Sequence, residues 1–156
     1  MKIVKLTKKY ATTYYDKEDI EIFKNELFFY LLAKQKKISF IPKIVDFDCD
    51  KLTIRTKRVG ISLQEYCDKY ECEHNDYLSE IKKLYKNLKN LGYYHNDLRF
   101  KNIVINPNTH KLYLIDFEFS DREYKDKDDE KIVEKIKIKR KSKRRLNKTK
   151  RRSKKK

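Results

Sequence analysis

Glycine is scarce in this chain of 156 residues, which contains only Gly60 and Gly92. The phosphate-binding loop G-x-G-x-x-G needs three glycines so that backbone amides can approach the phosphates of a nucleotide closely. The sequence therefore excludes this loop, and no other segment stands out as a cover for a nucleotide. Any nucleotide site in the chain has to be built by other means.

Long apolar runs and an apolar N-terminal signal are also missing. Because a membrane-spanning helix needs about 20 apolar residues, we expect no transmembrane segment and an intracellular location, cytoplasmic or nuclear. In that setting Cys49, Cys67 and Cys72 would be free thiols. Cys67, Cys72 and His74 offer only three ligands at irregular spacing, which argues against a zinc site.

Acidic residues are absent from the last part of the chain, and this absence explains its charge. The net charge is +17, with 41 Lys and Arg against 24 Asp and Glu. Residues 135–156 hold 15 of the basic residues and no acid, which leaves 26 basic against 24 acidic residues in residues 1–134. The first 134 residues are therefore nearly neutral, and the basic character belongs to a tail.

Hydrophobic periodicity predicts the first elements. Residues 2–6 alternate like a short strand, and the residues after Asp16 switch to helical spacing. This helix carries Glu26. Two strand-like runs follow at residues 41–47 and 52–56. The expected apolar stripe of the helix comprises Ile20, Phe23, Leu27 and Leu31.

A second group of elements follows Gly60, which permits a bend. Ser62 and Glu65 have the spacing of a capping box at the start of a short helix. Gly92 is placed to end a longer helix. The expected apolar face of that longer helix comprises Leu78, Ile81, Leu84, Leu88 and Leu91.

Three polar residues bracket a predicted β-hairpin. Asp97 and Asn102 precede the β-rich run at 103–105, and Asp116 follows the run at 112–115, which a Pro-Asn turn joins to the first. This set consists of a carboxylate, an amide five residues later and a second carboxylate beyond the hairpin. Such a set suits phosphoryl transfer, in which positioning and Mg²⁺ do most of the work.

The same residues match two motifs of the protein-kinase-like superfamily. Residues 95–102 read H-N-D-L-R-F-K-N, which resembles the catalytic loop H-x-D-x-x-x-x-N. Residues 116–118 read D-F-E, which resembles the metal-binding motif D-F-G. The H-N-D and D-F-E forms are more similar to choline, ethanolamine and aminoglycoside kinases than to eukaryotic protein kinases, which favour H-R-D and D-F-G.

This resemblance implies catalytic roles for several residues. Asp97 would be the catalytic base that orients an acceptor hydroxyl, and Asn102 and Asp116 would hold Mg²⁺. Arg99 would reach the γ-phosphate of ATP, with an exposed loop arginine of no such role as the alternative. His95 resembles the structural histidine of the family, and we assign it no proton transfer.

The resemblance also implies a nucleotide contact in the first part of the chain. Lys5 resembles the strand lysine that contacts the α- and β-phosphates of ATP, and Glu26 resembles the helix carboxylate that anchors this lysine. Lys5 ends an Ile-Val-Lys strand pattern that we expect to lie opposite the helix. Lys2, Lys8 and Lys9 are its neighbours and its alternatives.

The implied fold is α+β, a truncated two-lobed protein-kinase-like fold. Residues 1–59 would form a reduced N-lobe in the order β, α, β, β, without the first two strands of the family. Residues 60–121 would form a reduced C-lobe with the catalytic and metal loops. Residues 122–156 would be a charged linker and a basic tail, disordered or helical, because the tail cannot bury enough apolar surface to fold by itself.

We therefore predict an ATP-dependent and Mg²⁺-dependent phosphotransferase with an unknown hydroxyl acceptor, either a protein or a small molecule. One alternative is a pseudokinase that binds a nucleotide or a partner without catalysis. Another is a nucleic-acid-binding protein that acts through its tail. Residues 135–156 are expected to bind nucleic acid without sequence specificity, with an anionic membrane, nuclear targeting and solubilisation as further alternatives.

Overall fold

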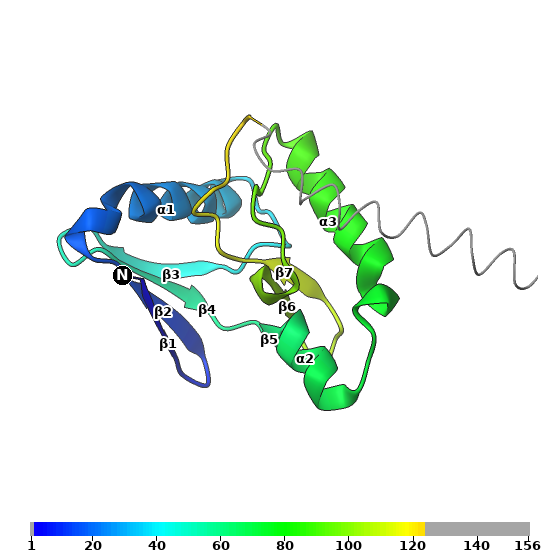
Figure 1. Ribbon diagram of the computed structural model, residues 1–156. Helices are drawn as coiled ribbons and strands as arrows, with labels where there is room; N and C mark the ends of the chain where they lie inside the picture. The colour runs from blue at the N-terminus through cyan, green and yellow to red at the C-terminus, as the bar shows by residue number, and fades with distance from the viewer. Residues whose placement is uncertain (1, 124–156) are drawn as a thin grey trace, which may run out of the picture.

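The computed structural model describes residues 2–123, and the basic tail lies outside the described residues. Figure 1 shows two groups of elements. The first four strands and helix α1 lie on one side of the molecule, and helices α2 and α3 with a second sheet lie on the other. This arrangement confirms the predicted two-lobed α+β fold. Among the described residues, no helix is long and apolar enough to cross a membrane.

The first sheet has four antiparallel strands in the order β1-β2-β4-β3. Its strands are β1 (Ile3–Leu6), β2 (Tyr10–Tyr14), β3 (Ile44–Asp48) and β4 (Thr53–Lys57). The predicted order β, α, β, β is wrong in one respect, because it lacks β2. The segment YATTY is rich in aromatic and β-branched residues, which favour strands. It pairs antiparallel with β1, with Thr13 opposite Val4.

Helix α1 (Ile20–Gln35) follows a short 3-10 turn, η1 (Lys17–Asp19), and packs on β3 and β4. The predicted helix is correct, but the predicted stripe is only half right: Phe23 is buried and Leu27 packs against the core, whereas Ile20 and Leu31 are exposed. The buried face of the helix includes the carboxylate of Glu26. A search for apolar periodicity cannot find this face, because it counts only apolar residues. The buried side chains are Phe23, Glu26, Phe29, Tyr30 and Ala33.

The chain crosses between the two groups at Gly60. A Cβ atom on this residue would lie 1.8 Å from the backbone oxygen of Ile105, so the close approach of the two backbones requires glycine. Strand β5 (Ile61–Ser62) then pairs with β6, and α2 (Leu63–Tyr70) begins. The Ser62 hydroxyl accepts a hydrogen bond from the Glu65 amide at 3.1 Å, which confirms the predicted N-cap.

Helix α3 (Leu78–Asn90) follows the 3-10 turn η2 (His74–Tyr77) and carries the buried face that the sequence predicts. It ends before Gly92, whose φ of +84° is a left-handed conformation that favours glycine. The turn η3 (Phe100–Asn102) leads into the predicted hairpin of β6 (Ile103–Ile105) and β7 (Leu112–Leu114). These elements place the loop at residues 95–102 directly before the hairpin.

The cysteines differ from the expectation. Cys67 and Cys72 form a disulfide at the C-terminal end of α2, so the prediction of three free thiols is wrong for this pair. The left-handed residue Glu71 (φ 52°) ends the helix and returns the chain, so that the two cysteines meet across this turn. Cys49 is a free and exposed cysteine.

Candidate active site

The loop at residues 95–102, which resembles a kinase catalytic loop, holds its acid and its amide in direct contact. Asn102 donates from Nδ2 to the backbone oxygen of Asp97 at 2.9 Å and to its carboxylate Oδ2 at 2.8 Å. The other oxygen of Asp97 pairs with Nε of Arg99, whose side chain is otherwise exposed. Asp97 and Asn102 are both buried. Because the amide nitrogen of Asn102 faces Asp97, its carbonyl oxygen is the atom that would ligate a cation.

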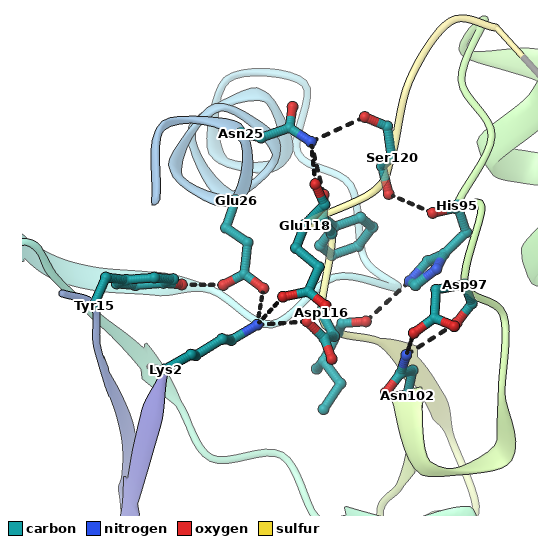
Figure 2. Close-up of polar contacts among 12 residues, drawn as sticks. Lys2, Tyr15, Asn25, Glu26, His95, Asp97, Asn102, Asp116, Glu118 and Ser120 are labelled. Carbon is teal, nitrogen blue, oxygen red and sulfur yellow. Dashed lines mark hydrogen bonds and ion pairs between the residues drawn. The ribbon is translucent and has the colours of Figure 1, made fainter. Parts of the chain in front are cut away.

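His95 and Ser120 connect the catalytic loop to the segment after β7. His95 is fully buried, and its Nε2 lies 2.9 Å from the backbone oxygen of Ile115. Ser120 donates from Oγ to the backbone oxygen of His95 at 3.0 Å, as Figure 2 shows. The ring of His95 also packs on Phe117. These contacts suit the structural role that the sequence resemblance implies for His95.

Three carboxylates from the two motifs meet at one place. Oxygen atoms of Asp97, Asp116 and Glu118 lie within 4.8 Å of one another. Together with the amide oxygen of Asn102 they form a set of hard oxygen donors, which is the set that Mg²⁺ prefers. The donor set therefore fits Mg²⁺ held by Asn102 and Asp116, and Glu118 adds a carboxylate beside them.

A lysine from the start of the chain reaches these carboxylates. Lys2 Nζ lies 2.6 Å from Glu26 Oε1, 2.5 Å from Asp116 Oδ1 and 3.5 Å from Glu118 Oε2 (Figure 2). Burial alone would lower the pKa of Lys2, but the Glu26 and Asp116 carboxylates outweigh burial and raise this pKa above its ordinary value. Lys2 is therefore a permanent cation at neutral pH, and it links α1 to the D-F-E motif at residues 116–118.

The structure corrects the expected position of the strand lysine. Side chains alternate between the two faces of a strand, so Lys2 and Val4 lie on the face that lines a cavity and Lys5 lies on the opposite face. Lys5 is exposed, and its Nζ lies 5.2 Å from the ring centroid of Tyr14. Lys2, and not Lys5, therefore lies opposite Glu26. Which lysine contacts a nucleotide remains a prediction.

Glu26 is held from two sides in the core. It accepts hydrogen bonds from Lys2 and from the hydroxyl of Tyr15, a buried residue just beyond β2. Burial raises the pKa of Glu26 to about 7, although Lys2 and Tyr15 oppose this shift. In Asp116 the balance is opposite. Burial would raise its pKa, but the Lys2 ammonium holds the pKa of Asp116 below its ordinary value.

A cavity of about 260 Å³ opens beside these residues. The β1–β2 hairpin forms one wall through Val4 and Thr13, and the crossing at Gly60 forms another. A hairpin of ordinary residues therefore lines the cavity on the side of β1, a segment that the sequence did not single out. Charged residues line the cavity as well, among them Lys2, Glu26 and Asp116.

Sequence reasoning missed two residues of this site. Lys2 was one of four lysines within nine residues, and only the pairing of β1 with β2 shows which of them faces inward. Tyr15 carried no motif, and its position follows from the unpredicted strand β2. A strand assignment at Tyr10–Tyr14, which its aromatic and β-branched residues favour, is the signal that could have identified both.

A protein-family model described as choline/ethanolamine kinase matches residues 5–128. The chain belongs to the choline/ethanolamine kinase family. The match covers both motifs and most of the described residues, and it confirms the protein-kinase-like resemblance of the sequence. Among curated proteins, none matches the chain.

Solved structures of WbdD are similar to this family member in fold. A crystal structure of monomeric WbdD matches 88% of the chain with a TM-score of 0.65 and 15% identity. A structure of the bifunctional kinase-methyltransferase WbdD matches 79% with a TM-score of 0.58 and 15% identity. A complex of WbdD with a kinase inhibitor matches 78% with a TM-score of 0.56 and 14% identity. The chain covers 35%, 30% and 31% of these structures, about a third of their length.

Proposed function

We propose that the chain is a Mg²⁺-dependent phosphotransferase that moves the γ-phosphoryl group of ATP to the hydroxyl of a small amino alcohol. The observation that carries this proposal is the meeting of Asp97, Asn102 and Asp116 beside a cavity whose charged residues include the Lys2–Glu26 pair. The family description, choline/ethanolamine kinase, supports the acceptor class. A protein hydroxyl is the alternative acceptor.

In this mechanism Asp97 accepts the proton of the acceptor hydroxyl as the hydroxyl oxygen bonds to the γ-phosphorus. The bond from the γ-phosphorus to the bridging oxygen of ADP breaks in the same step. Arg99 is paired with Asp97 and is otherwise exposed, and in this mechanism it would turn to the γ-phosphate. Mg²⁺, held by Asn102 and Asp116, would neutralise the phosphate charge that develops.

Lys2 takes the nucleotide role that the sequence resemblance gave to Lys5. It lies at the end of the cavity nearest the metal carboxylates, and Glu26 holds it there. An ammonium in this place would contact the α- and β-phosphates of ATP. Lys2 directly precedes β1, and the neighbouring strand β2 contributes Thr13 to the lining of the same cavity.

The direct test is transfer of labelled γ-phosphate from ATP in the presence of Mg²⁺, with choline, ethanolamine and a protein mixture as acceptors. We expect transfer to one amino alcohol, and we expect Asp97→Asn to slow it by about 10³-fold, the order typical of a lost general base. Asp50→Asn, in an exposed turn, is the matched control and should react like the wild type. Equal transfer by the Asp97 and Asp50 variants would refute the assignment of Asp97 as the general base.

A nucleotide-binding protein without turnover is the second candidate. The observation in its favour is that the Lys2 ammonium already contacts Asp116 and Glu118, the carboxylates that a cation would occupy. Under this candidate ATP binds in the cavity but no acceptor is phosphorylated. ATP binding with no transfer to any acceptor would favour it over the phosphotransferase.

A further inference from the structure

A single amide on α1 holds the segment that follows the metal-binding aspartate. Asn25 Nδ2 lies 2.9 Å from the backbone oxygen of Phe117, 3.1 Å from that of Glu118 and 3.0 Å from that of Ser120. Figure 2 shows this side chain reaching from the helix to the segment. An amide has two N–H donors, so three converging carbonyl groups keep both donors occupied.

The residue just before this segment has an unfavourable backbone. Asp116 has a φ of +67°, in the left-handed region that residues with a Cβ rarely adopt, although Asp tolerates it better than most. Such a conformation persists only where the surroundings hold it. The carbonyl groups that Asn25 binds begin at the next residue, so its hydrogen bonds act on the backbone that sets the direction of the Asp116 carboxylate.

The helix reaches Asp116 by two routes. Asn25 binds the backbone after Asp116, and Glu26, the next residue of α1, binds Lys2, which binds the Asp116 side chain. The ring of Phe117, in the segment that Asn25 binds, stacks on Phe29 of the same helix with the ring centroids 5.0 Å apart. Residues of α1 therefore hold both the backbone beside Asp116 and, through Lys2, its side chain.

We propose that Asn25 is a positioning residue for the metal site: its amide fixes the backbone of residues 117–120 and thereby aims the Asp116 carboxylate at the cation that accompanies the nucleotide. This inference rests on the proposed function for its ligand, the Mg²⁺ complex of ATP. The clamp itself rests on contacts of the chain alone. Asn25 has no contact with substrate in this account and acts only through Asp116.

Hydrogen exchange tests the clamp without any ligand. The amides of Ser120 and Asp121 are hydrogen-bonded to Phe117 and Tyr94 carbonyl groups, so their exchange reports whether the segment stays docked. We expect exchange at these amides to be about tenfold faster in Asn25→Ala, the order given by loss of one or two hydrogen bonds. The matched control is Lys24→Ala, at an exposed neighbour on the same helix.

Calorimetric titration tests the consequence for the metal. ATP is titrated with Mg²⁺ and with chelator, and the ratio of the two affinities gives the gain due to the metal. In Asn25→Ala and in Asn25→Asp, which has the same size but faces the carbonyl oxygens with a carboxylate, we expect this gain to fall about tenfold. Affinity for ATP without metal should stay within about twofold of the wild type, which a general loss of folding would not allow.

The two measurements test separate parts of the proposal: that Asn25 holds residues 117–120, and that this contact positions Asp116 for the metal. Unchanged exchange in Asn25→Ala overturns the clamp, whatever the wild type binds. Faster exchange with an undiminished metal gain overturns the positioning role and leaves a structural contact. If the wild type binds no ATP, the proposed function fails, and the exchange measurement alone still decides whether Asn25 holds the segment.

Discussion

The catalytic loop and the first sheet contribute to one site in different ways. In the loop, Asp97 and Asn102 lie five residues apart and contact each other directly, so their spacing in the sequence already specifies their geometry. In the sheet, Lys2 meets Glu26 and Asp116 across 24 and 114 residues, and only strand pairing brings them together. Local motifs can be read from spacing, whereas a charge on a strand can be placed only when the register is known.

The two regions also treat their carboxylates differently. Glu26 lies in the core of the first region, where burial raises its pKa to about 7. Asp116 lies at the edge of the second region, where the Lys2 ammonium lowers its pKa. One ammonium thus bridges a carboxylate that tends to hold a proton and one that stays ionised. Breaking this bridge from either side should separate the contributions of the two regions.

Removing the lysine should have the largest effect on nucleotide affinity. A charge-assisted hydrogen bond contributes about 1.5–3 kcal/mol, so Lys2→Met should weaken ATP binding by about 10- to 100-fold. Lys5→Met, on the outer face of the same strand, is the matched control and should bind ATP like the wild type. Fluorescence or calorimetric titration measures both, and a larger loss in Lys5→Met would restore the assignment made from the sequence.

The same variant should have the opposite effect on a cation without nucleotide. Lys2 neutralises Asp116 and Glu118 in the free protein, so Lys2→Met leaves these carboxylates unpaired and attractive to a divalent ion. We expect Mn²⁺ to bind Lys2→Met several-fold more tightly than Lys5→Met in electron paramagnetic titrations. Weaker Mn²⁺ binding in Lys2→Met would show that the ammonium helps to assemble the metal site.

These contrasts show what the sequence could predict. The helices and the hairpin of the second region were predicted, because the capping box at Ser62, the glycine stop at Gly92 and the hairpin turn are signals within a few residues. The short strand β5 and the Cys67–Cys72 disulfide of the same region were not predicted. The helix around Glu26 was predicted, but its buried face was not, because that face includes a charge. Strand β2 was missed, and the orientation of Lys2 was lost with it. The left-handed backbone of Asp116 has no signature in a non-glycine residue.

Substitution of Asp116, the proposed metal ligand, should weaken Mg²⁺-dependent ATP binding more than substitution of Asp97, the proposed base. Asp116→Asn removes a charged oxygen donor and should weaken binding of the Mg²⁺ complex of ATP by about tenfold or more. Asp97→Asn changes the group that acts on the acceptor and should leave this affinity within about twofold. Calorimetry on the two variants separates the roles, and undiminished affinity in Asp116→Asn would reject the metal assignment.

Stability should depend on pH through Glu26. Its pKa rises from 4.5 in the unfolded chain to about 7 in the folded chain, so the folded state binds the proton more tightly. The resulting stabilisation is complete below about pH 4.5 and is lost as the pH rises through about 7. The melting temperature of the wild type should therefore fall across this range relative to Glu26→Gln. Glu21→Gln, exposed on the same helix, is the control and should follow the wild type.

The smallest effect at the site should come from the tail. Residues 1–134 carry 26 basic and 24 acidic residues, and the remaining 15 basic residues lie in residues 135–156. A chain that ends at Glu134 should bind ATP within about twofold of the full chain, but it should lose nearly all affinity for RNA or DNA. In the full chain that affinity should fall with salt, with a log-log slope of about −0.7 to −0.9 per phosphate neutralised. Filter binding over a salt series measures this, and equal binding of nucleic acid by both chains would place the basic site within residues 1–134.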